Sequence, residues 1–228
     1  MYNFPNSLFD LKVSKIFKFF CRFATNKCYN IKYMVKMILL IISLILQIIA
    51  YIPYLRDILK RKTEPHAYTW LIWAITQGIA AAGIYYGFGG LAIFQLIFGV
   101  ITVLIVFAFS FKYGTKNITK SDKIVFILAL LSIVVWWKLK QPLISILMVT
   151  LIDLFGFYPT LRKTYQEPWS ETLSTWIFFT LSNLLAIFCI SKYSLLTSTY
   201  LIAITFLDFL LVLVIFYRKK IVFKNTNK

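Results

Sequence analysis

Charged residues are scarce in this chain of 228 residues. Asp, Glu, Lys and Arg together make up 14% of it, whereas soluble domains average about 25%. Acidic residues are the rarest charged group, with 8 of them against 25 Lys and Arg. Hydrophobic residues account for 60%, and the mean hydropathy is +0.78. This shortage of charge excludes an ordinary soluble domain and predicts an all-α, polytopic membrane protein.

Residues that hold metals or form disulfides are also few. The three cysteines, Cys21, Cys28 and Cys189, make neither a disulfide framework nor a zinc-binding spacing. His66 is the one histidine of the sequence, and no nucleophile–base pair or pair of catalytic carboxylates stands out. We therefore predict no metal, no cofactor and no enzymatic activity.

The formal net charge of +17 raises the question of nucleic-acid binding. The Lys and Arg residues lie almost wholly between apolar runs, which is the pattern of membrane-protein loops. A nucleic-acid surface would instead show a basic groove with interleaved aromatic residues. The expected partner is therefore a lipid bilayer and not a nucleic acid.

Seven apolar runs are long enough to cross a bilayer, which takes about 20 residues per helix. Backbone amides cannot stay unpaired in hydrocarbon, so these runs must be helices. The runs are Met37–Tyr54, Ala67–Tyr86, Leu91–Phe111, Lys123–Trp137, Leu143–Leu161, Thr172–Ile190 and Leu195–Tyr217.

Residues 1–36 differ from the rest of the chain. They carry seven basic residues and one acidic residue, and Leu11–Phe23 has the pattern of a basic amphipathic helix. Such a helix lies on a membrane surface or directs a protein to an organelle. A third interpretation is that translation starts at Met34 or Met37.

Basic residues are distributed unequally among the loops. Fifteen Lys and Arg follow the first, third, fifth and seventh runs, whereas three follow the second, fourth and sixth. By the positive-inside rule, the C-terminus is cytoplasmic and the N-terminus is outside. The basic tail opposes this orientation unless it lies flat on the membrane or is absent. We expect an integral protein of the cell membrane.

The chain matches itself at an offset of 106 residues. The first run ends in Gln47-Ile-Ile-Ala-Tyr-Ile-Pro-Tyr-Leu-Arg56, and the fifth ends in Asp153-Leu-Phe-Gly-Phe-Tyr-Pro-Thr-Leu-Arg162. Each segment has a polar residue, then a small residue, then Pro and Leu-Arg at the same spacing. Because the runs that follow also match, the sequence indicates an internal duplication.

Three runs, one linking run and three more runs predict two parallel three-helix repeats joined by a linker helix. This plan, with the two prolines, resembles the PQ-loop and SWEET-like transporter superfamily over residues 37–217. The glutamine that follows the proline in that family is replaced by Tyr54 and Thr160, which leaves the subfamily open. The predicted segments are a basic tail (1–36), a first bundle (37–111), a linker with the fourth span (112–141), a second bundle (142–217) and a basic C-terminal tail (218–228).

The resemblance implies a carrier that moves a small polar solute by alternating access. Pro53 and Pro159 would then act as hinges, since proline removes a helix hydrogen bond. Arg56 and Arg162 match between the repeats. They are candidates for gate salt bridges, although ordinary positive-inside anchoring explains them equally well.

Two acidic residues, Asp153 and Asp208, fall near the middle of predicted spans, and no basic residue lies at a similar depth. A carboxylate at the centre of a membrane helix costs about 2.5–3.5 kcal/mol on insertion scales. We expect one or both of them to bind and release a proton that drives transport, as membrane aspartates do in the cystine exporter of the PQ-loop group. The alternative is a protonated carboxyl that only ties helices together. Thr150 and Thr205, three residues earlier on the same helical faces, are expected to donate hydrogen bonds to them.

The second and sixth runs present matching aromatic–amide faces, because positions i, i+3 and i+7 share one side of a helix. Such a pair of faces suits a flat or ring-shaped polar solute. Interfacial belts and packing between helices are the alternatives, and the first tryptophan of each face lies where a belt is expected. The faces are Trp70, Trp73 and Gln77, and Trp176, Phe179 and Asn183.

The sequence therefore predicts a solute carrier whose substrate contacts are Gln47, Trp73, Gln77, Phe179 and Asn183. Its expected partners are the bilayer, a small solute and protons. The alternative function is a membrane receptor or accessory protein on the same fold that transports nothing. A receptor for charged peptide tails should place basic residues in its cavity, and the predicted spans contain none there. The oligomeric state is not indicated.

Overall fold

The computed structural model describes residues 8–65, 67–114, 120–139 and 141–226. The chain is 86% helical, and the described residues contain no β-strand. Two units are distinguished, residues 1–38 and Leu39–Lys228, and the second holds every site discussed below. The helices are α1 (Leu8–Leu59), α2 (Ala67–Tyr86), α3 (Ala92–Tyr113), α4 (Lys120–Leu139), α5 (Pro142–Gln166), α6 (Leu173–Cys189) and α7 (Leu195–Thr226).

In the part of the chain that the structure describes, five helical segments are long and apolar enough to cross a membrane, and α6 is a shorter apolar helix of 17 residues. Together they indicate a helical membrane protein. The five segments are Ile31–Leu59, Ala67–Tyr86, Ala92–Tyr113, Pro142–Gln166 and Leu195–Val222.

Helix boundaries follow the predicted runs closely, with two differences. The sequence predicted an amphipathic helix at Leu11–Phe23 apart from the first apolar run, whereas both segments lie within α1, which begins at Leu8. Helices α1, α5 and α7 also run five, five and nine residues beyond the predicted ends, Tyr54, Leu161 and Tyr217. Good helix formers such as Leu, Arg and Lys occupy these extensions, so the helix outlasts the apolar run.

The outer faces of the helices expose large apolar side chains. On α1, Ile41, Ile45, Ile48 and Ile52 recur every three or four residues, and each is about half exposed. Helix α7 presents a similar stripe at Phe206, Phe209, Leu213 and Phe216. A soluble monomer rarely exposes so much apolar surface, whereas hydrocarbon matches it.

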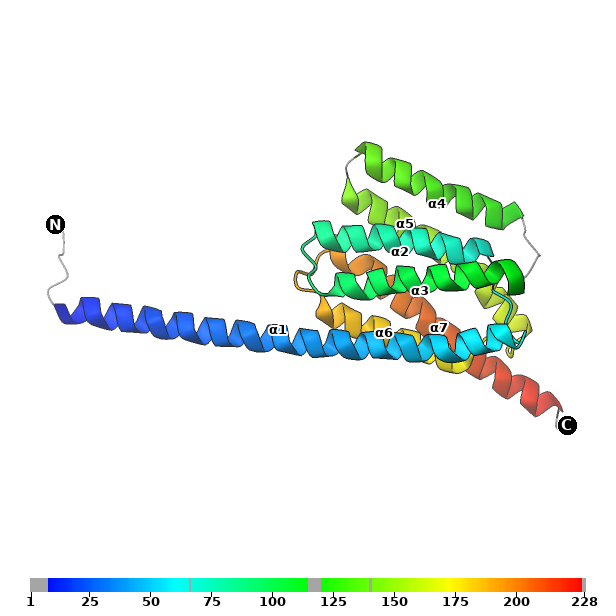
Figure 1. Cartoon of the computed structure of the whole chain (residues 1–228), viewed down its shortest axis with the longest axis horizontal. Helices are drawn as coiled ribbons and strands as arrows, with labels where there is room; N and C mark the ends of the chain where they lie inside the picture. Colours follow the sequence, from blue (N-terminus) through cyan, green and yellow to red (C-terminus); the bar gives the residue numbers. More distant parts are fainter. Residues whose placement is uncertain (1–7, 66, 115–119, 140, 227–228) are drawn as a thin grey trace. The chain divides into compact units, whose positions relative to one another are not determined.

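Within the second unit, α2 packs on α3 and α5, and α7 packs between α5 and α6 (Figure 1). Helix α6 also contacts α3, and α4 packs against α2 and α5. The C-terminal part of α1 approaches α6 closely through a reciprocal serine pair. The hydroxyls of Ser43 and Ser182 each donate to the other's backbone carbonyl at 2.9 Å. Small residues permit this close approach of two helices.

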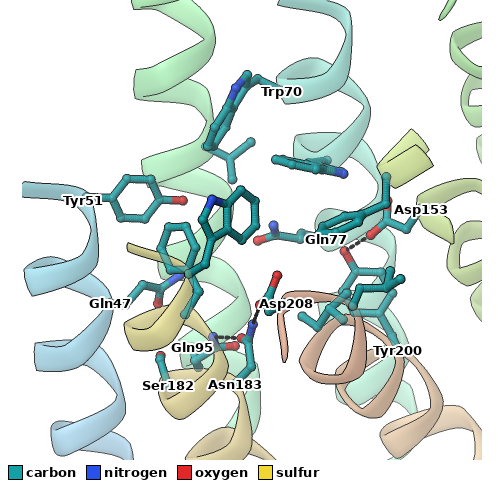
Figure 2. A pocket seen from close by; sticks show the side chains of 17 residues that line it. Gln47, Tyr51, Trp70, Gln77, Gln95, Asp153, Ser182, Asn183, Tyr200 and Asp208 are labelled. Carbon is teal, nitrogen blue, oxygen red and sulfur yellow. Dashed lines mark hydrogen bonds between the residues drawn. The ribbon is translucent and has the colours of Figure 1, made fainter. Parts of the chain in front are cut away.

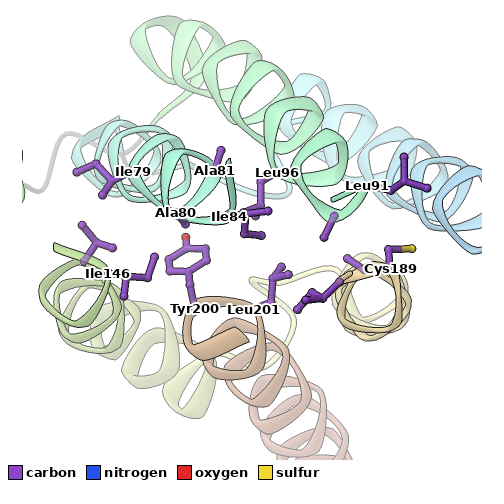
Figure 3. Packing of buried hydrophobic residues seen from close by; sticks show 14 of the residues in the cluster. Ile79, Ala80, Ala81, Ile84, Leu91, Leu96, Ile146, Cys189, Tyr200 and Leu201 are labelled. Carbon is purple, nitrogen blue, oxygen red and sulfur yellow. The ribbon is translucent and has the colours of Figure 1, made fainter. Parts of the chain in front are cut away.

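Buried apolar residues form two large clusters at opposite ends of the bundle. One lies at the α2–α3 end and includes Leu40, Ile84, Leu91, Ile190 and Leu201 (Figure 3). The other lies at the α1–α2 end and is rich in aromatic rings from four helices. Its rings are Tyr51, Tyr54, Trp70, Trp73, Phe157 and Trp176.

Between the clusters lies a group of buried polar residues, which we call the polar layer. On α2, for example, Thr76 follows Trp73 of one cluster and precedes Ile79 of the other. The same order holds on α6, where Asn183 lies between Trp176 and Ala186. The polar layer comprises Ser43, Gln47, Thr76, Gln95, Asp153, Ser182, Asn183 and Asp208.

The α1–α3 and α5–α7 triplets are joined by hydrogen bonds at both ends of the bundle. At the α1–α2 end, Thr172 Oγ1 donates to Asp57 Oδ2 at 2.7 Å. At the α2–α3 end, Gly90 and Ile190 form an isolated β-bridge, and the Ser191 N–H donates to the Gly89 carbonyl at 2.9 Å. We call these two sets of hydrogen bonds the closures, because they join the two triplets at the two ends of the bundle.

Gly90 should be required for the second closure. Its φ is +70°, and a Cβ there would collide with the Ser191 side chain. We expect Gly90→Ala to lower stability by about 1–2 kcal/mol, the usual cost of this conformation for an L-residue. Gly78→Ala is the matched control, because Gly78 lies within α2 with nothing near the added methyl, and alanine favours the helix. The measurement is thermal unfolding of both variants in detergent, and equal unfolding temperatures would contradict the requirement.

Candidate functional site

A cavity of about 60 Å³ lies where the polar layer meets the aromatic cluster. Helices α1, α2, α3, α5, α6 and α7 all contribute to its lining, so both triplets share it. Figure 2 shows amide and carboxyl groups along one side of this space and aromatic rings along the other. Its free volume is well below the roughly 300–1,000 Å³ of pockets for drug-sized ligands. In this closed state the cavity has room for water or a small chemical group.

Two hydrogen-bonded groups hold the carboxyls in place. Tyr200 Oη donates to Asp153 Oδ2 at 2.6 Å, which ties α7 to α5. Asn183 Nδ2 donates to Asp208 Oδ2 at 2.8 Å, which ties α6 to α7. Gln95 Nε2 of α3 extends the second group by donating to Asn183 Oδ1 at 2.7 Å. Both carboxyls are buried, with exposed fractions of 3% for Asp153 and 6% for Asp208.

The threonine partners expected for these carboxyls were wrong. The hydroxyls of Thr150 and Thr205 donate instead to the backbone carbonyls of Ile146 and Leu201, at 2.7 and 2.6 Å. A threonine hydroxyl inside a helix readily bonds the carbonyl four residues earlier. The two carboxyls are bonded from other helices instead. Tyr200 of α7 donates to Asp153, and Asn183 of α6 donates to Asp208.

Three acceptor atoms around the cavity have no hydrogen-bond partner among the residues that the structure describes. They are Gln47 Oε1, Gln95 Oε1 and Asp153 Oδ1, and all three are buried. A buried polar atom without a partner costs about 1–3 kcal/mol. Such atoms at one cavity point to a ligand or to water that donates hydrogen bonds there.

Gly99 of α3 leaves the space that the two neighbouring amides occupy. A Cβ at this position would collide with Gln77 Oε1 and come within 3.2 Å of Gln47 Nε2. The glycine thus allows amides from α1 and α2 to converge on the cavity. Figure 2 shows Gln77 directed into its centre.

Aromatic rings form the remaining wall. Trp176 lies edge-on to Phe157 and to Phe179, with ring centroids 5.7 and 5.8 Å apart and interplanar angles of 81° and 84°. Tyr51 contacts Phe179 in the same way at 4.9 Å. Trp73 lies 6.4 Å from Trp176, so rings from both triplets meet here.

All seven predicted substrate and proton sites line this one cavity. They are Gln47, Trp73, Gln77, Asp153, Phe179, Asn183 and Asp208. The structure adds lining residues that sequence reasoning missed, chiefly Tyr51, Gln95 and Tyr200. Gln95 carried a signal, since it is a polar amide within an apolar run. Tyr200 gave none, because it resembles an interfacial tyrosine near the start of its helix.

Both tryptophans for which an interfacial belt was expected are instead buried, each 3% exposed. Trp70 packs against Tyr54 and Trp73, with centroids 5.3 and 5.1 Å apart. Trp176 Nε1 donates to Glu171 Oε2 at 3.1 Å. These rings therefore cover the α1–α2 end of the cavity.

Pro53, Arg56 and Arg162, three of the predicted hinge and gate residues, are not among the residues that line the cavity. Pro53 is within α1, which continues to Leu59, and α5 likewise continues through position 159, whose side chain is outside the described residues. Arg56 is exposed and contacts Asp57 Oδ1 at 3.4 Å. Asp57 thus links Arg56 to the closing hydrogen bond from Thr172. Arg162 is exposed at an outer groove between α5 and α7.

Comparison with known proteins gives no match, whether to a protein family, to a curated protein or to a solved structure. Among the described residues, no group of three or more His, Cys, Asp or Glu is placed to hold a metal ion. His66 lies outside the described residues.

The Gln95–Asn183–Asp208 chain should contribute strongly to stability. Asn183→Leu leaves the Gln95 donor and an Asp208 oxygen without partners, and we expect a loss of about 2–4 kcal/mol. Thr150→Val is the control, because this buried hydroxyl bonds within its own helix. Thermal unfolding in detergent measures both variants. If Asn183→Leu unfolds at the same temperature as Thr150→Val, the chain contributes little.

Proposed function

We propose that this protein is a solute carrier of seven membrane-spanning helices that moves a small polar molecule by alternating access. The observation that carries the proposal is the cavity that the α1–α3 and α5–α7 triplets share, with buried carboxyl and amide groups among its lining residues. A purely structural bundle of apolar helices gains nothing from two carboxyls and three unpartnered acceptors at its centre. A cavity for a polar cargo requires such groups.

The contacts between the triplets support a duplicated, parallel arrangement. Helix α2 packs on α5 and α7, and in return α6 packs on α1 and α3. Two repeats related by an axis along the bundle would exchange contacts in this reciprocal way. The buried positions of α3 also recur in α7 at an offset of 105 residues: Gln95 and Tyr200, Leu96 and Leu201, Val103 and Asp208, Val106 and Leu211, and Ser110 and Ile215.

The two closures support a cycle of alternating access. The bonds between Thr172 and Asp57 and between Ser191 and Gly89 lie at opposite ends of the cavity. Breaking one while keeping the other would open the cavity to one side of the membrane. We propose that the α1–α2 end is cytoplasmic, since its loops carry more Lys and Arg, and that the cell membrane holds the protein. Pro53 and Pro159 would let α1 and α5 bend during opening.

Coupling to protons is part of the proposal. Asp153 and Asp208 are buried, and no Lys, Arg or His is among the described residues that line the cavity. An uncompensated buried carboxylate is costly, so it is neutralised by a proton or by a charged partner. A carboxyl that gains and loses its proton as the cavity opens to either side would couple solute movement to a proton gradient.

Transport by the purified protein in liposomes tests the proposal. A mixed metabolite library is offered with and without an imposed pH gradient, and internal solutes are identified by mass spectrometry. We expect at least one solute to accumulate, and to do so only with the gradient. Equal accumulation with and without the pH gradient would reject proton coupling. No accumulation by folded protein would favour a receptor or accessory protein on this fold.

The aspartates can be tested separately. We expect Asp153→Asn and Asp208→Asn to reduce gradient-driven accumulation at least tenfold, because asparagine keeps the shape but cannot exchange a proton. Glu64→Gln removes an exposed carboxylate in the α1–α2 loop and should leave transport unchanged. Substrate-driven acidification that persists in both aspartate variants would disprove their role.

A further inference from the structure

The lining of the cavity also bears on the chemical class of its cargo. We propose that the cargo is a small organic cation whose nitrogen carries hydrogen atoms, such as an ammonium, amidinium or guanidinium group. This inference rests on the proposed carrier function and specifies its substrate. It follows from charge, from unused hydrogen-bonding capacity and from the aromatic wall.

Charge is the first argument. Asp153 and Asp208 are the ionisable acids of the cavity, and its described lining includes no basic side chain. An anionic cargo would add negative charge to a space that already holds two carboxyls. A cation would supply the missing counter-charge and would take the place of a proton on one of them.

Hydrogen bonding is the second argument. The amide donors of Gln95 and Asn183 are already used within the site. The buried atoms around the cavity that have no partner among the described residues are acceptors, namely Gln47 Oε1, Gln95 Oε1 and Asp153 Oδ1. A cargo that fits must therefore donate hydrogen bonds. Protonated nitrogen groups do so at several positions at once, and charge makes these bonds stronger.

The aromatic wall is the third argument. Trp73, Phe157, Trp176 and Phe179 contact one another at centroid distances of 5.7–6.4 Å. Three of these four contacts are edge-on, so the ring planes stand at steep angles to one another, and all four residues line the cavity. Aromatic side chains arranged in this way bind cations through the negative potential of their faces, by about 2 kcal/mol or more when water is excluded.

Size restricts the cargo further. The closed cavity measures about 60 Å³, and Gly99 already supplies the space that its amides need. A cationic head group of a few heavy atoms fits this space better than a large ring system does.

The test compares three small probes that differ in charge or in N–H groups. Methylguanidinium and N-methylurea are nearly isosteric, but only the first is charged, while tetramethylammonium is charged and lacks N–H groups. Binding to the purified full-length protein is followed by tryptophan fluorescence and calorimetry at constant ionic strength. We expect methylguanidinium to bind at least tenfold more tightly than either other probe. Equal binding of methylguanidinium and N-methylurea would overturn the proposal.

Variants locate the binding. Asp208→Asn and Trp73→Leu should each weaken methylguanidinium binding at least tenfold. Their controls are Glu64→Gln and Trp169→Leu, which change an exposed acid and an exposed ring in loops. Equal losses in variant and control would place the binding elsewhere. Should a cavity variant fail to fold, the comparison of the three probes on the unmodified protein still decides the question.

Failure of this inference can be told apart from failure of the carrier proposal. Liposome accumulation of neutral or anionic solutes, with no preference for cations, would reject the cationic cargo and keep the carrier. Tight binding of methylguanidinium without uptake into liposomes would keep the cation site and reject transport.

Discussion

The rest of the bundle depends on two carboxyl groups that are buried among apolar helices, with no basic side chain among the described residues that line their cavity. Each must be held by hydrogen bonds, and each bond joins two helices: Tyr200 ties α7 to Asp153 of α5, and Asn183 ties α6 to Asp208 of α7. The packing of α5, α6 and α7 is thereby fixed in register as well as in orientation. A slip of one residue along any of them would leave a carboxyl without its partner.

The two apolar clusters make this constraint stronger. Because they flank the polar layer at both ends, a missing hydrogen bond there is costly unless a water molecule or a ligand in the cavity replaces it. The apolar surroundings also strengthen electrostatic interactions inside the cavity. Under the proposed function, stability and solute selectivity have one physical origin, because the polar groups that join the helices also line the cavity.

The positions of the helices along the chain were largely predictable, because apolar runs of about 20 residues leave the backbone few alternatives to a helix. The internal match of the sequence also pairs Gln47 with Asp153, and both residues line the cavity. The hydrogen-bond partners were not predictable. A carboxyl on one helix can be reached from several neighbours, and only the packing shows that Tyr200 is the partner of Asp153 and that Thr150 bonds its own helix.

The two closures differ in chemistry. At the α1–α2 end the bond is made by side chains, Thr172 and Asp57, whereas at the α2–α3 end it is made by backbone groups of Gly89 and Ser191. A single nucleotide change can weaken a side-chain bond, but no substitution removes a backbone carbonyl. Substitution can therefore change the bond at the α1–α2 end directly, whereas it reaches the bond at the α2–α3 end only through the conformation of the turn, as at Gly90. We therefore expect homologous chains to vary at the positions of Asp57 and Thr172 and to keep glycine in the turn at Gly89 and Gly90.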